Sequence, residues 1–159
     1  LMSDKTEKTI YKIKEGDNIK TFITANLTFN NSKVKKVIIT GDHMILLNFT
    51  GDKKIECSGD QPFFSIKNMG DNVKIGSNTS ISNNQKIWIA QDNSTSKKNI
   101  EKLQVNDNVF ITSNTASGIE SISLLEIIFL GTLSARQVYT LELENGNAFI
   151  ANGFIVKTK

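Results

Sequence analysis

The sequence is poor in residues that staple or bend a fold. Among 159 residues there is one cysteine, Cys57, one histidine, His43, and one proline, Pro62. A single thiol excludes an internal disulfide. Without a cluster of cysteine and histidine we expect no metal site and no cofactor. The chain also lacks an apolar run of the ~20 residues needed to cross a bilayer, because its best stretch, 124–133, is short and contains Glu126.

Charge of one sign is also scarce. The net charge is +3, and lysines are scattered among acids. The one local cluster, Lys33, Lys35 and Lys36, lacks the interleaved aromatic residues of many nucleic-acid surfaces, so we expect a solvated strand edge and no nucleic-acid partner. With 38% hydrophobic and 22% charged residues, the chain can bury a core. Its length fits one domain.

Short apolar alternations, separated by Gly, Asn, Asp and Ser, dominate what is present. A period of two is typical of half-buried β-strands, and no long helical periodicity is visible. The alternations predict strands over residues 19–23, 34–39, 44–49, 55–57, 87–90, 109–111, 123–130, 138–143 and 148–156. We expect a polar surface excursion with one weak strand over 68–85 and a loop over 112–118. The predicted fold class is all-β.

The C-terminal tail has the strongest local pattern. Apolar and polar residues alternate over 139–143, and Asn145-Gly146 supplies residues that accept positive φ in a tight turn. We therefore predict a β-hairpin in which the strand before this turn pairs with the apolar strand after it. A second kink is expected at Asn152-Gly153.

A second pattern is an internal repeat, since residues 8–19 align without gaps on residues 98–109. In each copy, apolar residues precede an aspartate, Asp17 or Asp107, that opens a turn leading into a strand. A similar order of elements follows both copies, which indicates two pseudo-symmetric halves. The predicted organisation is one domain, 1–159, with half-repeats at about 8–64 and 98–158.

Three segments, in order, resemble a known family. The opening, 1–19, contains an Ile-x-x-Gly-Asp-x-Ile-like run. The segment 51–64 carries Ser-Gly-Asp-Gln-Pro before large apolar residues, and 138–158 has Asn-Gly before a short apolar run. Together they resemble the Hint domain, the self-cleaving module of inteins and hedgehog proteins. The resemblance spans nearly the whole chain. It implies an all-β, pseudo-two-fold disk or horseshoe of long bent strands, closed by the terminal hairpins.

The resemblance also implies where self-cleavage would take place. In the family, a Cys or Ser at the first position attacks the preceding carbonyl, and a Thr and a His assist departure of the amide nitrogen. On this chain, the nucleophile would lie about eight residues before Leu1. Ser58 stands in the place of the threonine and Gln61 in the place of the histidine. A carboxamide cannot deliver a proton near neutral pH, so this position is substituted.

The tail departs from the family in the same way. Inteins often have Asp and His where this chain has Thr140 and Asn147. The closing His-Asn is replaced by Lys157 and Thr158, and threonine has no side-chain amide with which to cyclise. The family's catalytic positions, Ser58, Gln61, Asn147, Lys157 and Thr158, are therefore mostly substituted.

Three side chains are chemically able to act as catalytic groups: those of Cys57, His43 and Lys157. Cys57 alternates with Ile55 on an apolar face, which favours a buried core cysteine over a nucleophile. His43 lies in a predicted turn, where an exposed side chain is expected. Lys157 could act as a base if burial lowered its pKa, but near the chain's end we expect it to be solvated.

We therefore expect a Hint-derived module that no longer splices, is not an enzyme, and has a structural or interaction role in a larger polypeptide. Its expected partners are the flanking segments of its own chain and other proteins. The start at Leu1, with a strand-like segment under way, is expected of a portion of something longer. Two alternatives stay open: an active N-terminal self-processing domain with its Cys or Ser nucleophile upstream of Leu1, and an unrelated all-β binding domain. Nothing in the sequence predicts a compartment.

Overall fold

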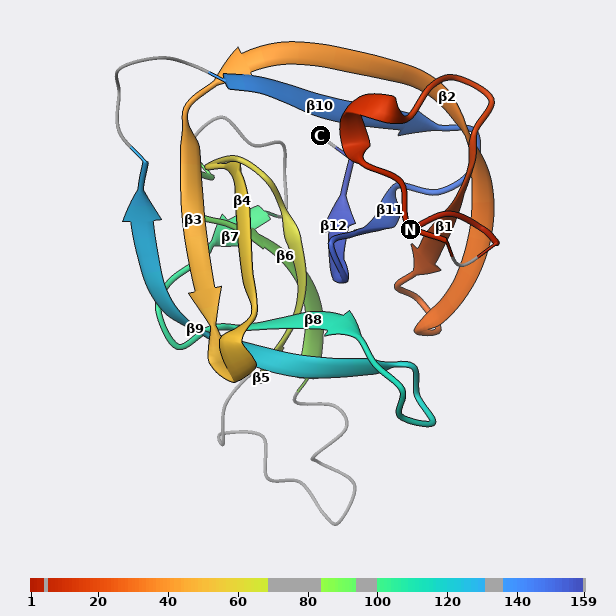
Figure 1. The fold of residues 1–159 in the computed structure, drawn as a ribbon. Coiled ribbons are helices and arrows are strands. Elements are labelled where there is room, and N and C mark those ends of the chain that lie inside the picture. Colours follow the sequence, from red (N-terminus) through yellow and green to blue (C-terminus); the bar gives the residue numbers. More distant parts are fainter. Residues whose placement is uncertain (5, 69–83, 94–99, 131–135, 159) are drawn as a thin grey trace.

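The computed structural model of the chain describes residues 1–4, 6–68, 84–93, 100–130 and 136–158 (Figure 1). Strands dominate these residues, and their helical part consists of two 3₁₀ turns, η1 (Ile10–Lys12) and η2 (Thr50–Asp52). The strands are β1 (Asn18–Ile23), β2 (Thr28–Asp42), β3 (Met44–Phe49), β4 (Lys54–Ser58), β5 (Phe63–Asn68), β6 (Asn84–Ala90), β7 (Ile100–Lys102), β8 (Asn108–Thr112), β9 (Ile119–Phe129), β10 (Arg136–Leu143), β11 (Ala148–Ala151) and β12 (Phe154–Lys157). Within the described part, no helix is long and apolar enough to cross a membrane.

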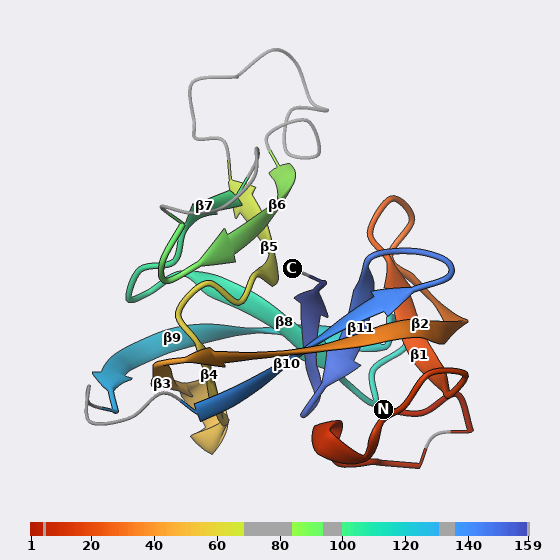
Figure 2. The ribbon, with the colours of Figure 1, turned by 90° about the horizontal axis from the view of Figure 1, so that it is seen from above.

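The strands form one curled, mainly antiparallel sheet. Its main path runs β10-β2-β1-β11-β12-β8-β9-β3-β4, while β5 pairs with β12 and β6, and β6 pairs in parallel with β7. Two views at right angles show the curl: β2 and β10 arch along one side, β8 and β9 lie opposite, and β11 and β12 run between them (Figures 1 and 2). The all-β architecture predicted from the sequence is confirmed.

The turn before β1 is closed by an aspartate. The N–H of Lys14 donates to Oδ2 of Asp17 at 3.1 Å. The backbone then locks onto β2, because the N–H of Gly16 donates to the carbonyl of Val34 and the N–H of Val34 donates to the carbonyl of Asp17, both at 2.8 Å. This set of bonds fixes where β1 begins relative to β2.

The turn before β8 has the same bonds in the same order. The N–H of Gln104 donates to Oδ2 of Asp107 at 2.8 Å. The N–H of Asn106 donates to the carbonyl of Leu124 at 2.8 Å, and the N–H of Leu124 donates to the carbonyl of Asp107 at 2.9 Å. The pairs β1–β2 and β8–β9 therefore begin alike, although the half-repeat limits of 8–64 and 98–158 stay a prediction.

The ladders that follow also correspond. β10 pairs antiparallel with β2, with a register shift between Glu142 and Leu143. β3 pairs antiparallel with β9, with a register shift between Asn48 and Phe49. A bulge in the same place on each ladder bends both pairs. β2 and β3, from the first half of the chain, thus each pair with a strand from the second half, β10 and β9 respectively.

Apolar side chains gather on both faces of the central strands. Because successive residues of a strand point to opposite faces, Phe154 and Val156 of β12 join one cluster and Ile155 joins the other. The larger cluster contains Leu47, Leu103 and many aliphatic residues. The smaller one is aromatic, with Phe64 in ring contact with Phe22, Trp88 and Phe110. The core prediction for Cys57, which is buried, is confirmed.

Every strand predicted by alternation overlaps an observed one. The alternation pattern indicates neither β5 nor β7. It predicts one kinked strand over 148–156, where the structure has two strands, β11 and β12. The polar excursion expected over 68–85 lies mostly outside the described residues. The loop expected over 112–118 is present after β8.

The predicted hairpin across Asn145-Gly146 is wrong. β10 pairs along its length with β2, and β11 pairs with β1 and β12. Gly146 does adopt positive φ, 82°, but its loop joins strands of different ladders. The tight hairpin is β11–β12, closed by Asn152-Gly153 with φ of 49° and 81°. Turn chemistry is local, whereas the partner of β10 is set by a strand distant in sequence.

Candidate functional site

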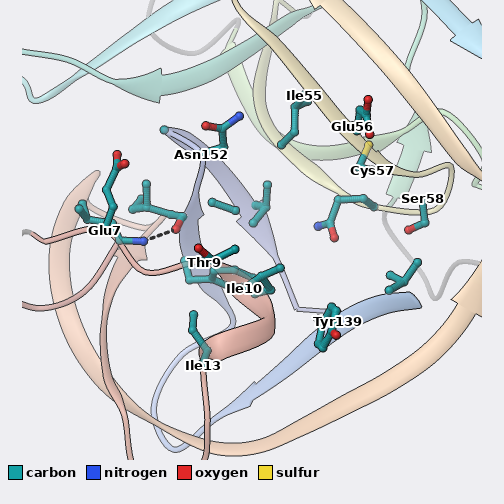
Figure 3. A pocket seen from close by; sticks show the side chains of 18 of the residues that line it. Glu7, Thr9, Ile10, Ile13, Ile55, Glu56, Cys57, Ser58, Tyr139 and Asn152 are labelled. Carbon is teal, nitrogen blue, oxygen red and sulfur yellow. Dashed lines mark hydrogen bonds between the residues drawn. The ribbon is translucent and has the colours of Figure 1, made fainter. Parts of the chain in front are cut away.

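A cleft of about 770 Å³ opens between the N-terminal segment, the β11–β12 hairpin and β4 (Figure 3). One wall carries Thr9, Ile10 and Ile13 around η1, and the other carries the side chains of β4. Tyr139 of β10 also contributes. The two end strands of the main sheet path, β4 and β10, therefore meet at the same cleft.

Ser58 and Gln61 lie together in the lining of this cleft. β4 ends at Ser58, whose buried hydroxyl donates to Oδ1 of Asp60 at 2.7 Å. The N–H of Gln61 donates to the carbonyl of Ser58 at 3.2 Å, which closes a four-residue turn. Pro62 then leads into β5. The turn places the hydroxyl of Ser58 and the carboxamide of Gln61 between the end of β4 and the start of β5.

Gln61 joins the ends of β5 and β12. Its Nε2 donates to the carbonyl of Lys157 at 2.9 Å and to the carbonyl of Pro62 at 3.1 Å. The N–H of Lys157 in turn donates to the carbonyl of Pro62 at 3.1 Å. The side chain thus links the start of β5 to the end of β12 through hydrogen bonds. A carboxamide offers hydrogen bonds here but no transferable proton near neutral pH.

Lys157 contributes its backbone to this arrangement and points its side chain elsewhere. Its ammonium lies 5.9 Å from the centroid of the Trp88 ring. Trp88 belongs to the aromatic cluster, whereas Val156 lines the cleft, so the two neighbours project from opposite faces of β12. Lys157 is half-buried rather than fully solvated, which corrects the sequence expectation.

Asn147 and Thr158 lie at the end of the β11–β12 ladder. The N–H of Thr158 donates to the carbonyl of Asn147 at 2.8 Å, one step beyond the pair Ala148–Lys157. Neither residue is part of the cleft lining. The structure therefore brings Ser58 and Gln61 together, ties Gln61 to the backbone of Lys157, and leaves Asn147 and Thr158 outside the cleft.

Leu1 lines the cleft, and its amino group is tied to β11. It donates to the carbonyl of Ile150 at 2.9 Å, and the carbonyl of Leu1 accepts from the N–H of Lys20 at 2.9 Å. Burial lowers the pKa of this ammonium, and the carboxylate of Glu7 acts in the opposite direction. Sequence reasoning missed Leu1, Glu7 and Asn152 as lining residues, because distant segments meet here and no local pattern marks them.

The cleft lining combines hydroxyls, carboxamides, carboxylates, two lysines and a thiol. Cys57 lines it but is buried within the larger core cluster. His43, the chain's one histidine, is exposed between β2 and β3 and does not line the cleft. In the described ranges, no group of three or more His, Cys, Asp and Glu residues could hold a metal ion. The lining side chains therefore offer hydrogen-bonding and charged groups to the cleft but no imidazole.

Comparison with known proteins gives a clear likeness at the level of fold. No family model and no curated protein matches the sequence. Among solved structures, the chain is similar to a DnaB intein from Synechocystis sp. PCC 6803, with 17% identity, 92% of this chain and 81% of that one covered, and a TM-score of 0.63. It is also similar to a bacterial intein-like domain from Clostridium thermocellum, with 16% identity, 94% and 86% covered, and a TM-score of 0.62.

A third similar structure, the Ssp DnaB mini-intein variant M86, has 16% identity and a TM-score of 0.64, with 91% of this chain and 77% of that one covered. At such identities the likeness concerns the fold alone. It overturns the alternative of an unrelated sandwich or barrel. The chain therefore has the Hint fold of inteins and intein-like domains.

Proposed function

We propose that this chain is a Hint module that no longer splices and that serves a structural or interaction role within a larger polypeptide. The observation that supports this most strongly is the use made of Gln61. Its side-chain Nε2 donates hydrogen bonds to the carbonyls of Lys157 and Pro62. The position that would need an acid in a self-cleaving relative instead holds two strand ends together.

The closing residues support the same proposal. A terminal asparagine cyclises through its carboxamide, and Thr158 offers only a hydroxyl. The ammonium of Lys157 lies over Trp88, on the face of β12 away from the cleft. Neither residue therefore presents an acid or a cyclising group to Ser58 and Gln61.

The test uses the chain in its natural sequence context, with a folded reporter protein joined at each end. The purified precursor is incubated with and without a thiol and followed by intact-mass spectrometry. We expect a single unchanged mass under both conditions. A joined pair of reporters, or release of either one, would contradict the proposal.

A second candidate is self-cleavage at the N-terminal side only, with a Cys or Ser nucleophile upstream of Leu1. The position of Leu1 favours it, because Leu1 lines the same cleft as Ser58 and Gln61. In the same precursor, thiol-dependent release of the N-terminal reporter alone supports this candidate. Replacing the upstream Cys or Ser by Ala is the matched control and must abolish that release.

A further inference from the structure

The chain contains two Asn-Gly pairs, Asn145-Gly146 and Asn152-Gly153, in different settings. In such a pair the backbone nitrogen of glycine can attack the side-chain carbonyl carbon of asparagine. The new C–N bond closes a five-membered succinimide, and ammonia leaves. Water then opens the ring to aspartate or isoaspartate. Glycine favours the attack because it has no Cβ to block the approach, and the rate depends on how easily the two atoms meet.

The first pair lies in an exposed loop between β10 and β11. All four residues of 144–147 are exposed. The loop is anchored on its N-terminal side, where the N–H of Glu144 donates to the carbonyl of Lys33 at 3.0 Å and the N–H of Asn145 donates to Oγ of Ser32 at 2.9 Å, and on its C-terminal side, where the carbonyl of Asn147 accepts the N–H of Thr158 at 2.8 Å. Downstream, a Cβ placed on Gly146 would meet nothing within 4 Å. Gly146 therefore lies in open space between its two anchored neighbours.

The reacting groups of this pair are also unengaged. Within the part of the chain that the structure describes, the side-chain amide of Asn145 and the N–H of Gly146 make no hydrogen bond. Asn145 is not held at positive φ, unlike Asn152. Its side chain can therefore rotate toward the nitrogen of Gly146 without losing a contact.

The second pair is locked. Asn152 and Gly153 form the two-residue turn of β11–β12, with φ of 49° and 81°, and the ladder pair Ala151–Phe154 closes it. The carbonyl of Gly153 accepts the N–H of Thr112 at 2.8 Å. The side chain of Asn152 donates to the carbonyl of Lys54 at 3.4 Å. Attack here requires the turn to open first.

We propose that Asn145 is a self-modification site, which converts to aspartate and isoaspartate through a succinimide formed with Gly146, while Asn152 is protected by the fold. Each conversion consumes one water and releases one ammonia. Aspartate adds a negative charge beside Glu144. Isoaspartate routes the main chain through Cβ and lengthens the link between β10 and β11.

The experiment follows both sites in the intact, folded chain at mildly alkaline pH, by peptide mapping with mass spectrometry that separates aspartate from isoaspartate. We expect Asn145 to convert at least about tenfold faster than Asn152, because opening the second turn breaks hydrogen bonds at its closing pair. An Asn145→Gln variant, which would need a larger ring, should show almost no conversion at that site.

The decisive comparison repeats the measurement in denaturant. With the fold removed, both Asn-Gly pairs should convert at similar rates. Similar rates in the folded chain, or faster conversion of Asn152, would overturn the proposal. A preference for Asn145 that persists unchanged in denaturant would also overturn it, since the structure would then have no part in the selectivity.

Discussion

The turn before β1 and the turn before β8 share their backbone bonds, but among the described residues only the first turn and its flanks border the cleft. Asp17 and Asp107 each accept the N–H three residues earlier, at 3.1 and 2.8 Å. Asp17 also binds the ammonium of Lys8 at 2.7 Å, and Lys8 lines the cleft. The repeated part of the molecule is therefore a scaffold, and the halves differ where they meet the cleft.

The largest effect on stability is expected at Leu47 and Leu141. They hold matching places in β3 and β10, and both are fully buried. We expect Leu47→Ala and Leu141→Ala each to lower the free energy of unfolding by about 2–5 kcal/mol, through lost burial and a residual cavity. Urea unfolding measures both. Similar losses support equivalent halves. A near-zero loss at one position would break the comparison.

The next largest effect is expected at Gln61, on the cleft side of the comparison. Gln61→Glu places a carboxylate against the carbonyl oxygens of Lys157 and Pro62, so a donor becomes a repelling acceptor. We expect a loss of about 2 kcal/mol near neutral pH, against about 1 kcal/mol for Gln61→Met, which only removes the donor. Protonation of the new carboxyl restores a donor, so its excess loss should shrink in acid. Equal losses for both variants at all pH values would contradict this hydrogen-bonding role of Gln61.

The two aspartates allow a sharper, smaller test. Hydrogen bonds from Lys8 and then from the N–H of Lys14 hold the pKa of Asp17 below its ordinary value. A depressed carboxyl pKa stabilises the fold above the unfolded-state pKa of about 3.9, and this gain is lost as pH falls through the folded-state pKa. We expect Asp17→Asn to cost less than about 1 kcal/mol at pH 7, since the ion pair is partly solvated.

The variant Asp107→Asn is measured beside it, because it keeps an acceptor for Gln104 in the second turn. Unfolding is measured from pH 7 to strongly acidic pH. The cost of Asp17→Asn should be present at pH 7 and vanish in acid. A cost at position 17 that grows on acidification would show the wrong sign.

The smallest expected effect is at Lys157. Lys157→Met keeps an apolar stem over Trp88 but removes the charge, which should cost about 0.5–1 kcal/mol. Fluorescence of Trp88, the chain's one tryptophan, reports whether the stem stays in place. An unchanged spectrum with a small loss of stability supports the placement. No loss at all would mean that the ammonium does not contact the ring.

Alternating segments made most strands predictable, because burial of one face leaves a period of two in the sequence. β7 was not predictable, since a three-residue strand in parallel pairing depends on β6 rather than on its own pattern. The partner of β10 was mispredicted for the same reason. Asn145-Gly146 is a strong local turn signal, but pairing with β2 determines where the chain goes next.

The site was predictable only in part. The resemblance placed Ser58 and Gln61 together, and both line the cleft. The roles assigned to these residues stay predictions. The direction of the Lys157 side chain depends on the phase of β12, which the tail sequence alone does not fix. Leu1 and Glu7 reach the cleft through tertiary packing and left no sequence signal.

The central claim is that the chain keeps the Hint fold while splicing chemistry is absent. Its most direct test is the intact mass of the precursor, in natural sequence context between two reporters, over a long incubation with and without thiol. The account predicts one unchanged mass throughout. A ligated reporter pair, which requires cleavage at both ends of the chain, would contradict it.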